Sequence, residues 1–152
     1  MSVFLEIARQ HAAADAAFES AIVVANQVDD ESAFDQGWLD RARNDQAYFL
    51  FLFTRFEEAI NQAFASLIAN KSAGLWQDVR AWSVWEGKKL SDIPLLLKAS
   101  LLLQKGRKEY NDVREFYKGR NDIAHGSQYD EPFVIQVVAR RMTQITQAFV
   151  TT

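Results

Sequence analysis

Apolar residues recur at helical spacing along most of this chain. From Ser2 to about Val28, small and apolar residues return every three or four positions, and from Trp38 to Ala69 a longer stripe does the same. The second stripe consists of Phe49, Leu52, Phe53, Phe56, Ile60, Ala63, Phe64 and Leu67. The pattern predicts two long helices, the second at the centre of the core. The acidic stretch 28–37 between them predicts a loop.

The second half of the chain shows shorter periodic stretches with helix start and stop signals. Ser91 is a candidate N-cap, and Pro132 suits the first turn of a last helix. The expected helices cover residues 75–85, Ser91 to Leu103, Tyr110 to His125, and Asp130 to the C-terminus. No strand pattern or repeat appears in the sequence. We therefore predict an all-α fold, an antiparallel bundle of about five to six helices forming one domain over residues 1–152.

Composition narrows the chemistry that the chain can perform. There are no cysteines, which excludes disulfides, thiolate metal sites and a Cys nucleophile. The two histidines are far apart and no metal or nucleotide motif is present, so we predict neither a metal nor a cofactor. His11 lies on the apolar stripe of the first helix, where a lone His is more often a hydrogen-bonded core or edge residue than a catalytic one. No leader or membrane span is recognisable, so we expect a cytoplasmic protein without membrane partners.

The charge is unevenly distributed although its total is only −3. Residues 1–76 contain five Lys and Arg and eleven Asp and Glu. Residues 77–152 contain twelve Lys and Arg and nine Asp and Glu. This excess of cations around residues 105–120 suggests contacts with an RNA backbone. We assign those contacts to Arg107, Lys108, Arg114, Lys118 and, further on, Tyr129. The alternative is a solvated helix face whose cations pair with neighbouring carboxylates.

The stretch from Tyr110 to Gly126, YNDVREFYKGRNDIAHG, carries the most specific chemistry. Arg120 supplies a permanent cation whose planar fork matches phosphate oxygens, and His125 supplies a proton carrier. Asn121 and His125 are four apart and share a helix face, whereas Arg120 lies about 100° away. Arg120 and His125 would therefore converge only at a frayed helix end or across two subunits. Gly126 is a helix stop signal.

The chain has an Arg, a polar residue directly after it, and a His separated from the Arg by four residues, near the end of a late helix in a small all-helical domain. This arrangement resembles the HEPN superfamily, in which four to six residues separate the Arg from the His. The matching residues are Arg120, Asn121 and His125, and the motif match covers about seventeen residues. Many HEPN proteins are metal-independent RNA-cutting toxins or defence nucleases. The resemblance implies an endoribonuclease that acts as a homodimer, with two copies of the motif at the interface.

The chemistry of such a site follows from its residue types. His125 would transfer protons, Arg120 would stabilise charge on the phosphoryl oxygens, and Asn121 would orient His125 or the substrate. The nucleophile is the 2′-hydroxyl of the RNA itself. The products would be a 2′,3′-cyclic phosphate and a 5′-hydroxyl.

One position departs from a known mode of control in the family. Some toxin members carry a Tyr two residues after the His, which a nucleotidyltransferase antitoxin modifies with AMP. Here Ser127 holds that place and the first Tyr is Tyr129. The sequence thus does not match that nucleotidyltransferase partner, and an antitoxin of another kind remains open.

Two other interpretations of the motif are open at the level of sequence. Arg120 and His125 could simply interact with the last carbonyls of a helix. The chain could also be a non-catalytic HEPN-like helical module for RNA or nucleotide binding or for dimerisation, which would keep the basic residues without needing His125.

Overall fold

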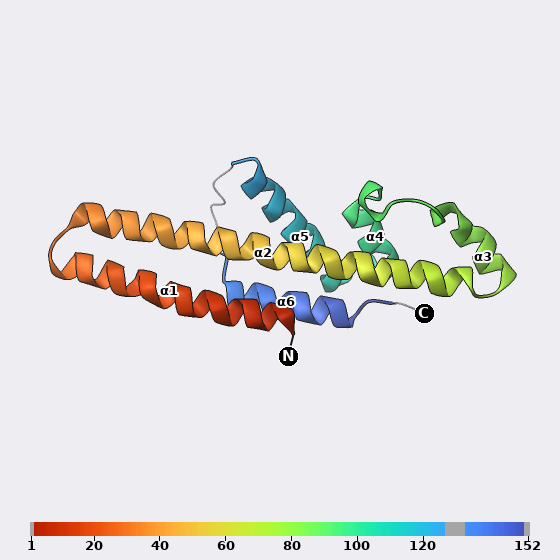
Figure 1. Cartoon of the computed structure of the whole chain (residues 1–152), viewed down its shortest axis with the longest axis horizontal. Helices are drawn as coiled ribbons and strands as arrows, with labels where there is room; N and C mark the ends of the chain where they lie inside the picture. Colours follow the sequence, from red (N-terminus) through yellow and green to blue (C-terminus); the bar gives the residue numbers. More distant parts are fainter. Residues whose placement is uncertain (1, 127–132, 151–152) are drawn as a thin grey trace. The chain divides into compact units, whose positions relative to one another are not determined.

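The computed structural model describes residues 2–126 and 133–150 of the chain. The described helices are α1 (Val3–Gln27), α2 (Glu31–Ser72), α3 (Trp76–Trp82), α4 (Leu95–Leu102), α5 (Lys108–Ala124) and α6 (Ile135–Gln147), with short 3-10 turns η1 (Ser83–Trp85) and η2 (Leu90–Asp92). No strand occurs in these two ranges, so the predicted all-α helix bundle is confirmed (Figure 1). None of the described helices combines the length and apolar character that crossing a bilayer would require.

The chain divides into two compact units. Unit 1 comprises residues 1–53 and 119–143, and unit 2 comprises residues 54–118 and 144–152. Helices α2, α5 and α6 each contribute residues to both units. The expectation of a single domain stays a prediction.

In unit 1, α1 folds back alongside the first half of α2 (Figure 1). The predicted loop over residues 28–37 is wrong, because α2 already begins at Glu31. The Asp30 carboxylate accepts a hydrogen bond from the Ala33 amide (3.0 Å) and caps the helix, and Glu31 lies in the first turn, where negative charge is favourable. The acidic residues that suggested a loop therefore start a helix.

Close contact between α1 and α2 requires the glycine at position 37. A Cβ at Gly37 would lie 2.7 Å from Cγ1 of Ile22, nearer than real side-chain atoms approach. Ile22 is buried, so its side chain occupies the space over this glycine. Gly37 thus lies inside α2 because α1 packs directly against the backbone there.

Phe49 of α2 is fully buried in the core of unit 1. The Phe133 ring stacks on the Phe49 ring with centroids 3.8 Å apart and lies over Gly119, where an added Cβ would be 3.1 Å from Phe133. The other buried apolar residues of the unit come from α1, α2 and α6 and include Phe4, Ile7, Leu52, Phe53, Ile135, Val138, Ala139 and Met142.

Unit 2 has its own core, where the rings of Phe56 and Phe116 meet edge to face at 6.2 Å and Phe64 meets Trp85 at 5.6 Å. Lys98 of α4 is only 2% exposed. Its Nζ donates to Asn61 Oδ1 (2.5 Å) and to the Leu90 carbonyl (3.0 Å). Burial lowers the pKa of the Lys98 ammonium.

The predicted N-cap of α4 is wrong. Pro94 occupies the cap position, and the Ser91 hydroxyl bonds instead to the Asp92 carboxylate (3.1 Å) within η2. The reason is that residues 90–92 form a 3-10 turn of their own, whose Leu90 carbonyl is held by Lys98. The helix consequently begins only after the proline.

Candidate functional site

The motif residues lie at the C-terminal end of α5, in unit 1. The His125 amide donates to the Asn121 carbonyl (3.0 Å), so His125 continues the last helical turn. The Gly126 amide then bonds to the Ile123 carbonyl (3.0 Å), with Gly126 at φ +75°. The predicted glycine stop is confirmed, because this left-handed conformation suits a residue without Cβ.

Arg120 and Asn121 are joined directly. Arg120 Nη1 donates to Asn121 Oδ1 at 3.0 Å, and both side chains are half-buried. Across the described ranges, Arg120 forms no ion pair with a carboxylate, so its charge is available to a phosphate. Such an uncompensated guanidinium beside an amide is a suitable anion contact.

His125 is exposed at the end of the helix. Its imidazole has no bond to Arg120 in the described part of the chain. The structure thus brings Arg120 and Asn121 together and leaves His125 one turn beyond Asn121, with its ring open to an incoming group. Of the three predicted catalytic residues, two are in contact within one chain.

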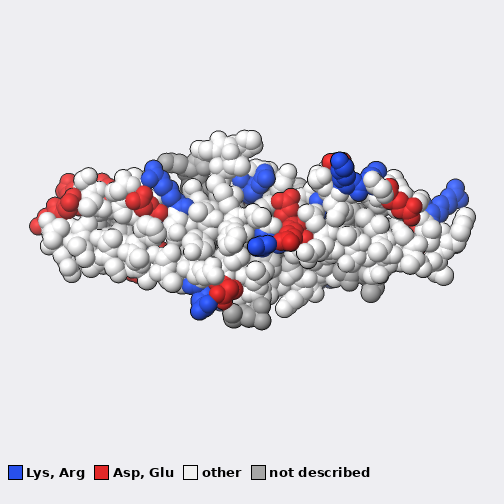
Figure 2. Space-filling model, viewed as in Figure 1, with Lys and Arg blue, Asp and Glu red and all other residues white. Residues whose placement is uncertain are grey.

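The residues predicted to contact RNA belong to unit 2, except for one. Arg107, Lys108, Arg114 and Lys118 are exposed, and Lys108 pairs with Asp112 at 2.9 Å. Tyr129 lies outside the described residues. Figure 2 shows blue and red groups interspersed on the face that it draws. The charges on this face therefore do not form a field of one sign.

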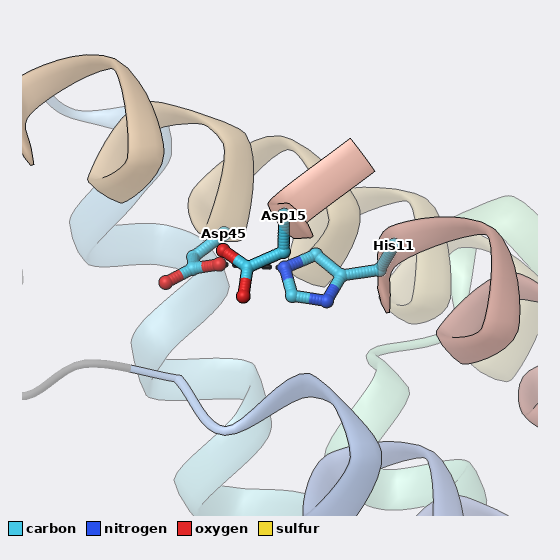
Figure 3. Close-up of side chains that lie close together, drawn as sticks. All are labelled: His11, Asp15 and Asp45. Carbon is cyan, nitrogen blue, oxygen red and sulfur yellow. Dashed lines mark hydrogen bonds and ion pairs between the residues drawn. The ribbon is translucent and has the colours of Figure 1, made fainter. Parts of the chain in front are cut away.

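A second polar cluster, absent from the sequence predictions, lies between α1 and α2 in unit 1 (Figure 3). His11 Nε2 and Asp45 Oδ1 are 2.6 Å apart, and the His11 residue is 4% exposed. The expectation that His11 is a hydrogen-bonded core or edge residue is confirmed, and the structure places it in the core. The edge of its ring also packs against Tyr48, with centroids 5.1 Å apart.

Asp15 joins the same cluster from α1. Arg41 of α2 holds both of its carboxylate oxygens, through Nε at 2.6 Å and Nη2 at 2.7 Å. The hydrogen bonds from the Arg41 guanidinium lower the pKa of the Asp15 carboxyl, and the same contact raises the pKa of Arg41. Two carboxylates and one guanidinium leave the cluster with a net charge of −1 while the imidazole is neutral.

A cavity of about 340 Å³ adjoins this cluster. Its remaining wall is mainly apolar and comes from α2, from the two residues before α6 and from the first turn of α6: Trp38, Ala42, Phe133, Val134, Ile135 and Gln136. The signal in the sequence was weak, because His11 and Asp15 share a helix face at a spacing of four but Asp45 follows 34 residues after His11. Only the pairing of α1 with α2 brings the three together.

No model of a protein family, no curated protein and no solved structure matches this chain. The assignment of a function therefore depends on the motif and on the geometry of its residues.

Proposed function

We propose that the chain is a metal-independent endoribonuclease of the HEPN type, with Arg120, Asn121 and His125 as its catalytic residues. The observation that carries the proposal is the end of α5, where His125 is exposed one turn beyond Asn121. Asn121 accepts a hydrogen bond from Arg120, which has no ion pair among the described residues. A proton carrier and a fixed cation are the two groups that cleavage by a 2′-hydroxyl requires.

In the proposed reaction, His125 removes the proton of the RNA 2′-hydroxyl, and the oxygen attacks the adjacent phosphorus. The guanidinium of Arg120 stabilises the additional negative charge on the phosphoryl oxygens. The bond to the 5′ oxygen breaks as that oxygen gains a proton, which gives a 2′,3′-cyclic phosphate and a 5′-hydroxyl. Asn121 holds Arg120 through its amide oxygen and leaves its NH₂ group available to the substrate.

The separation of Arg120 from His125 favours a site built from two chains. A base and an acid are both needed, and each chain offers one exposed histidine at this position. In a homodimer, one His125 would act as the base and the other as the acid. The cellular role would be that of a toxin or defence effector in the cytoplasm, neutralised by an antitoxin other than one that modifies a Tyr at position 127.

The test is incubation of the purified protein with end-labelled single-stranded RNA in excess EDTA, followed by analysis of the product ends. We expect a 2′,3′-cyclic phosphate and no cleavage of the DNA of the same sequence. His125→Ala should lower the rate by at least about 100-fold while RNA affinity is retained, because proton transfer typically contributes that much.

Two controls separate chemistry from loss of structure. Added imidazole should restore part of the activity of His125→Ala, since it replaces the missing proton carrier. Arg120→Ala should be inactive, whereas Arg43→Ala removes an exposed guanidinium of α2 and should cleave as the parent does. Equal activity of His125→Ala and the parent would refute the proposal.

The second candidate is a non-catalytic module for RNA binding or dimerisation. It is favoured by the absence of any His125 to Arg120 bond within the described chain. In this case the protein binds RNA in EDTA without cutting it, and His125→Ala leaves both properties unchanged.

A further inference from the structure

Three side chains of metal-ligand type converge in unit 1, away from the proposed catalytic residues in the sequence. His11, Asp15 and Asp45 each offer one donor atom, and these atoms all lie within 4.8 Å of one another (Figure 3). We propose that they form a binding site for a divalent transition metal ion, such as Zn²⁺ or Mn²⁺, which ties α1 to α2.

The charge of the cluster favours a cation over an anion. The Arg41 guanidinium donates two hydrogen bonds to Asp15 and would have to break them to bind a phosphate. The carboxylate of Asp45 faces His11 and would repel an anion that entered the cavity. When the imidazole is neutral, Asp15, Asp45 and Arg41 together carry a net charge of −1, which attracts a cation.

The donor atoms indicate which cations fit. One imidazole nitrogen with two carboxylates is a set that Zn²⁺, Mn²⁺ and similar ions accept, whereas Mg²⁺ prefers oxygen donors alone. Three protein ligands leave coordination positions open. The adjoining cavity of about 340 Å³ has room for the water molecules that would complete the shell.

The two ring nitrogens of His11 would have different roles. Nε2 faces Asp45, so it is the nitrogen that would bind the ion. Nδ1 is buried on the other side of the ring, away from Asp45, and has no partner in the described part of the protein. It would carry the ring proton while Nε2 binds the metal.

Arg41 is compatible with a metal at this place. Each carboxylate oxygen carries two lone pairs, so Asp15 can keep both bonds from Arg41 and still offer one lone pair to the ion. Arg41 would then orient the ligand in the way that hydrogen-bonding neighbours of metal ligands generally do. Its positive charge would also limit the affinity of the site.

The test uses protein that has been stripped with EDTA, dialysed free of chelator and titrated calorimetrically with ZnCl₂, MnCl₂ and MgCl₂. We expect about one Zn²⁺ or Mn²⁺ per chain, a higher melting temperature with the ion present, and much weaker binding of Mg²⁺. Asp45→Asn keeps the size of the side chain but offers a poor ligand, and should weaken binding at least tenfold. Asp40→Asn, on the same helix and outside the cluster, should bind as the parent does.

Asp15→Asn provides a second variant should Asp45→Asn fold poorly, which circular dichroism would reveal. Absence of binding to the parent at millimolar metal would overturn the inference, as would unchanged binding by both Asn variants. Loss of binding in His125→Ala would also overturn it, because the ion would then reside on the exposed histidine. Since the proposed cleavage proceeds in EDTA, failure here leaves the ribonuclease test unaffected.

Discussion

Lys98 is a charged residue that is buried in the core of unit 2. It interrupts the apolar stretch of α4, yet it is buried, while the neighbouring Leu97 is 40% exposed. The reason is that Lys98 caps the Leu90 carbonyl and bonds Asn61, contacts between segments that no local pattern reveals. The long stem of lysine makes such burial possible.

The lowered pKa of Lys98 predicts the sign of a pH effect on stability. The unfolded chain holds this proton with an ordinary lysine pKa near 10.5, whereas the folded chain holds it less tightly. Unfolding therefore takes up a proton between the lowered pKa and about pH 10.5, so raising the pH through that window increases the free energy of unfolding. Below the lowered pKa, the full cost of burying the charge remains.

Urea unfolding of the parent and of Lys98→Met at about pH 7.5 and pH 10 isolates this contribution. The stability of the parent relative to Lys98→Met should rise with pH. Lys89→Met is the control, because it removes an exposed lysine nearby in the sequence. The difference in the free energy of unfolding between the parent and Lys89→Met should be the same at both pH values. A relative stability that falls as the pH rises would contradict the assignment.

At the scale of the helices, periodicity was a good guide to where they lie and a poor guide to where they begin. The two long helices and the late motif helix appear where the apolar stripes predicted them. The starts of α2 and α4 were wrong, since one capping residue, Asp30, and one 3-10 turn, residues 90–92, decide them. Both depend on a few hydrogen bonds that hydrophobic spacing does not encode.

The contact of α1 with α2 at Gly37 makes a quantitative prediction. Gly37→Ala places a methyl group against Ile22 and should destabilise the protein by about 1–3 kcal/mol, although Ala is the better helix former. The same change in an Ile22→Ala background should cost less or even stabilise, because the obstructing side chain is gone. Chemical denaturation of the four proteins in this cycle measures the coupling. Equal costs in the two backgrounds would show that Ile22 does not cause the effect.

The two polar sites differed in how far the sequence could predict them. Arg120, Asn121 and His125 lie close together in the chain, and helical geometry alone places Asn121 and His125 on one face. The cluster of His11, Asp15 and Asp45 requires knowledge of which face of α1 meets which face of α2, and the sequence offers no signal for that pairing. The spacing of residues in the sequence is thus enough to predict which residues share one face of a helix. A site formed between two helices can be located only once the tertiary structure is known.

At the scale of the whole molecule, the proposed two-chain active site predicts a dependence on concentration. Cleavage per chain should fall when the protein is diluted below the dissociation constant of its dimer, because a lone chain has only one His125. Analytical ultracentrifugation gives the midpoint of dissociation, and the loss of specific activity should share that midpoint. Constant specific activity across the dissociation would mean that one chain suffices.

The stack of Phe133 on Phe49 over Gly119 has a consequence for the history of the sequence. Position 119 immediately precedes Arg120, so a larger residue there would push against Phe133 and disturb the end of α5 that carries the proposed catalytic residues. In related proteins, substitutions at positions 119 and 133 should therefore be correlated. Where position 119 carries a residue larger than Gly, position 133 should carry a side chain smaller than Phe. The pair supplies a criterion for recognising distant relatives that is independent of the Arg-Asn-His pattern itself.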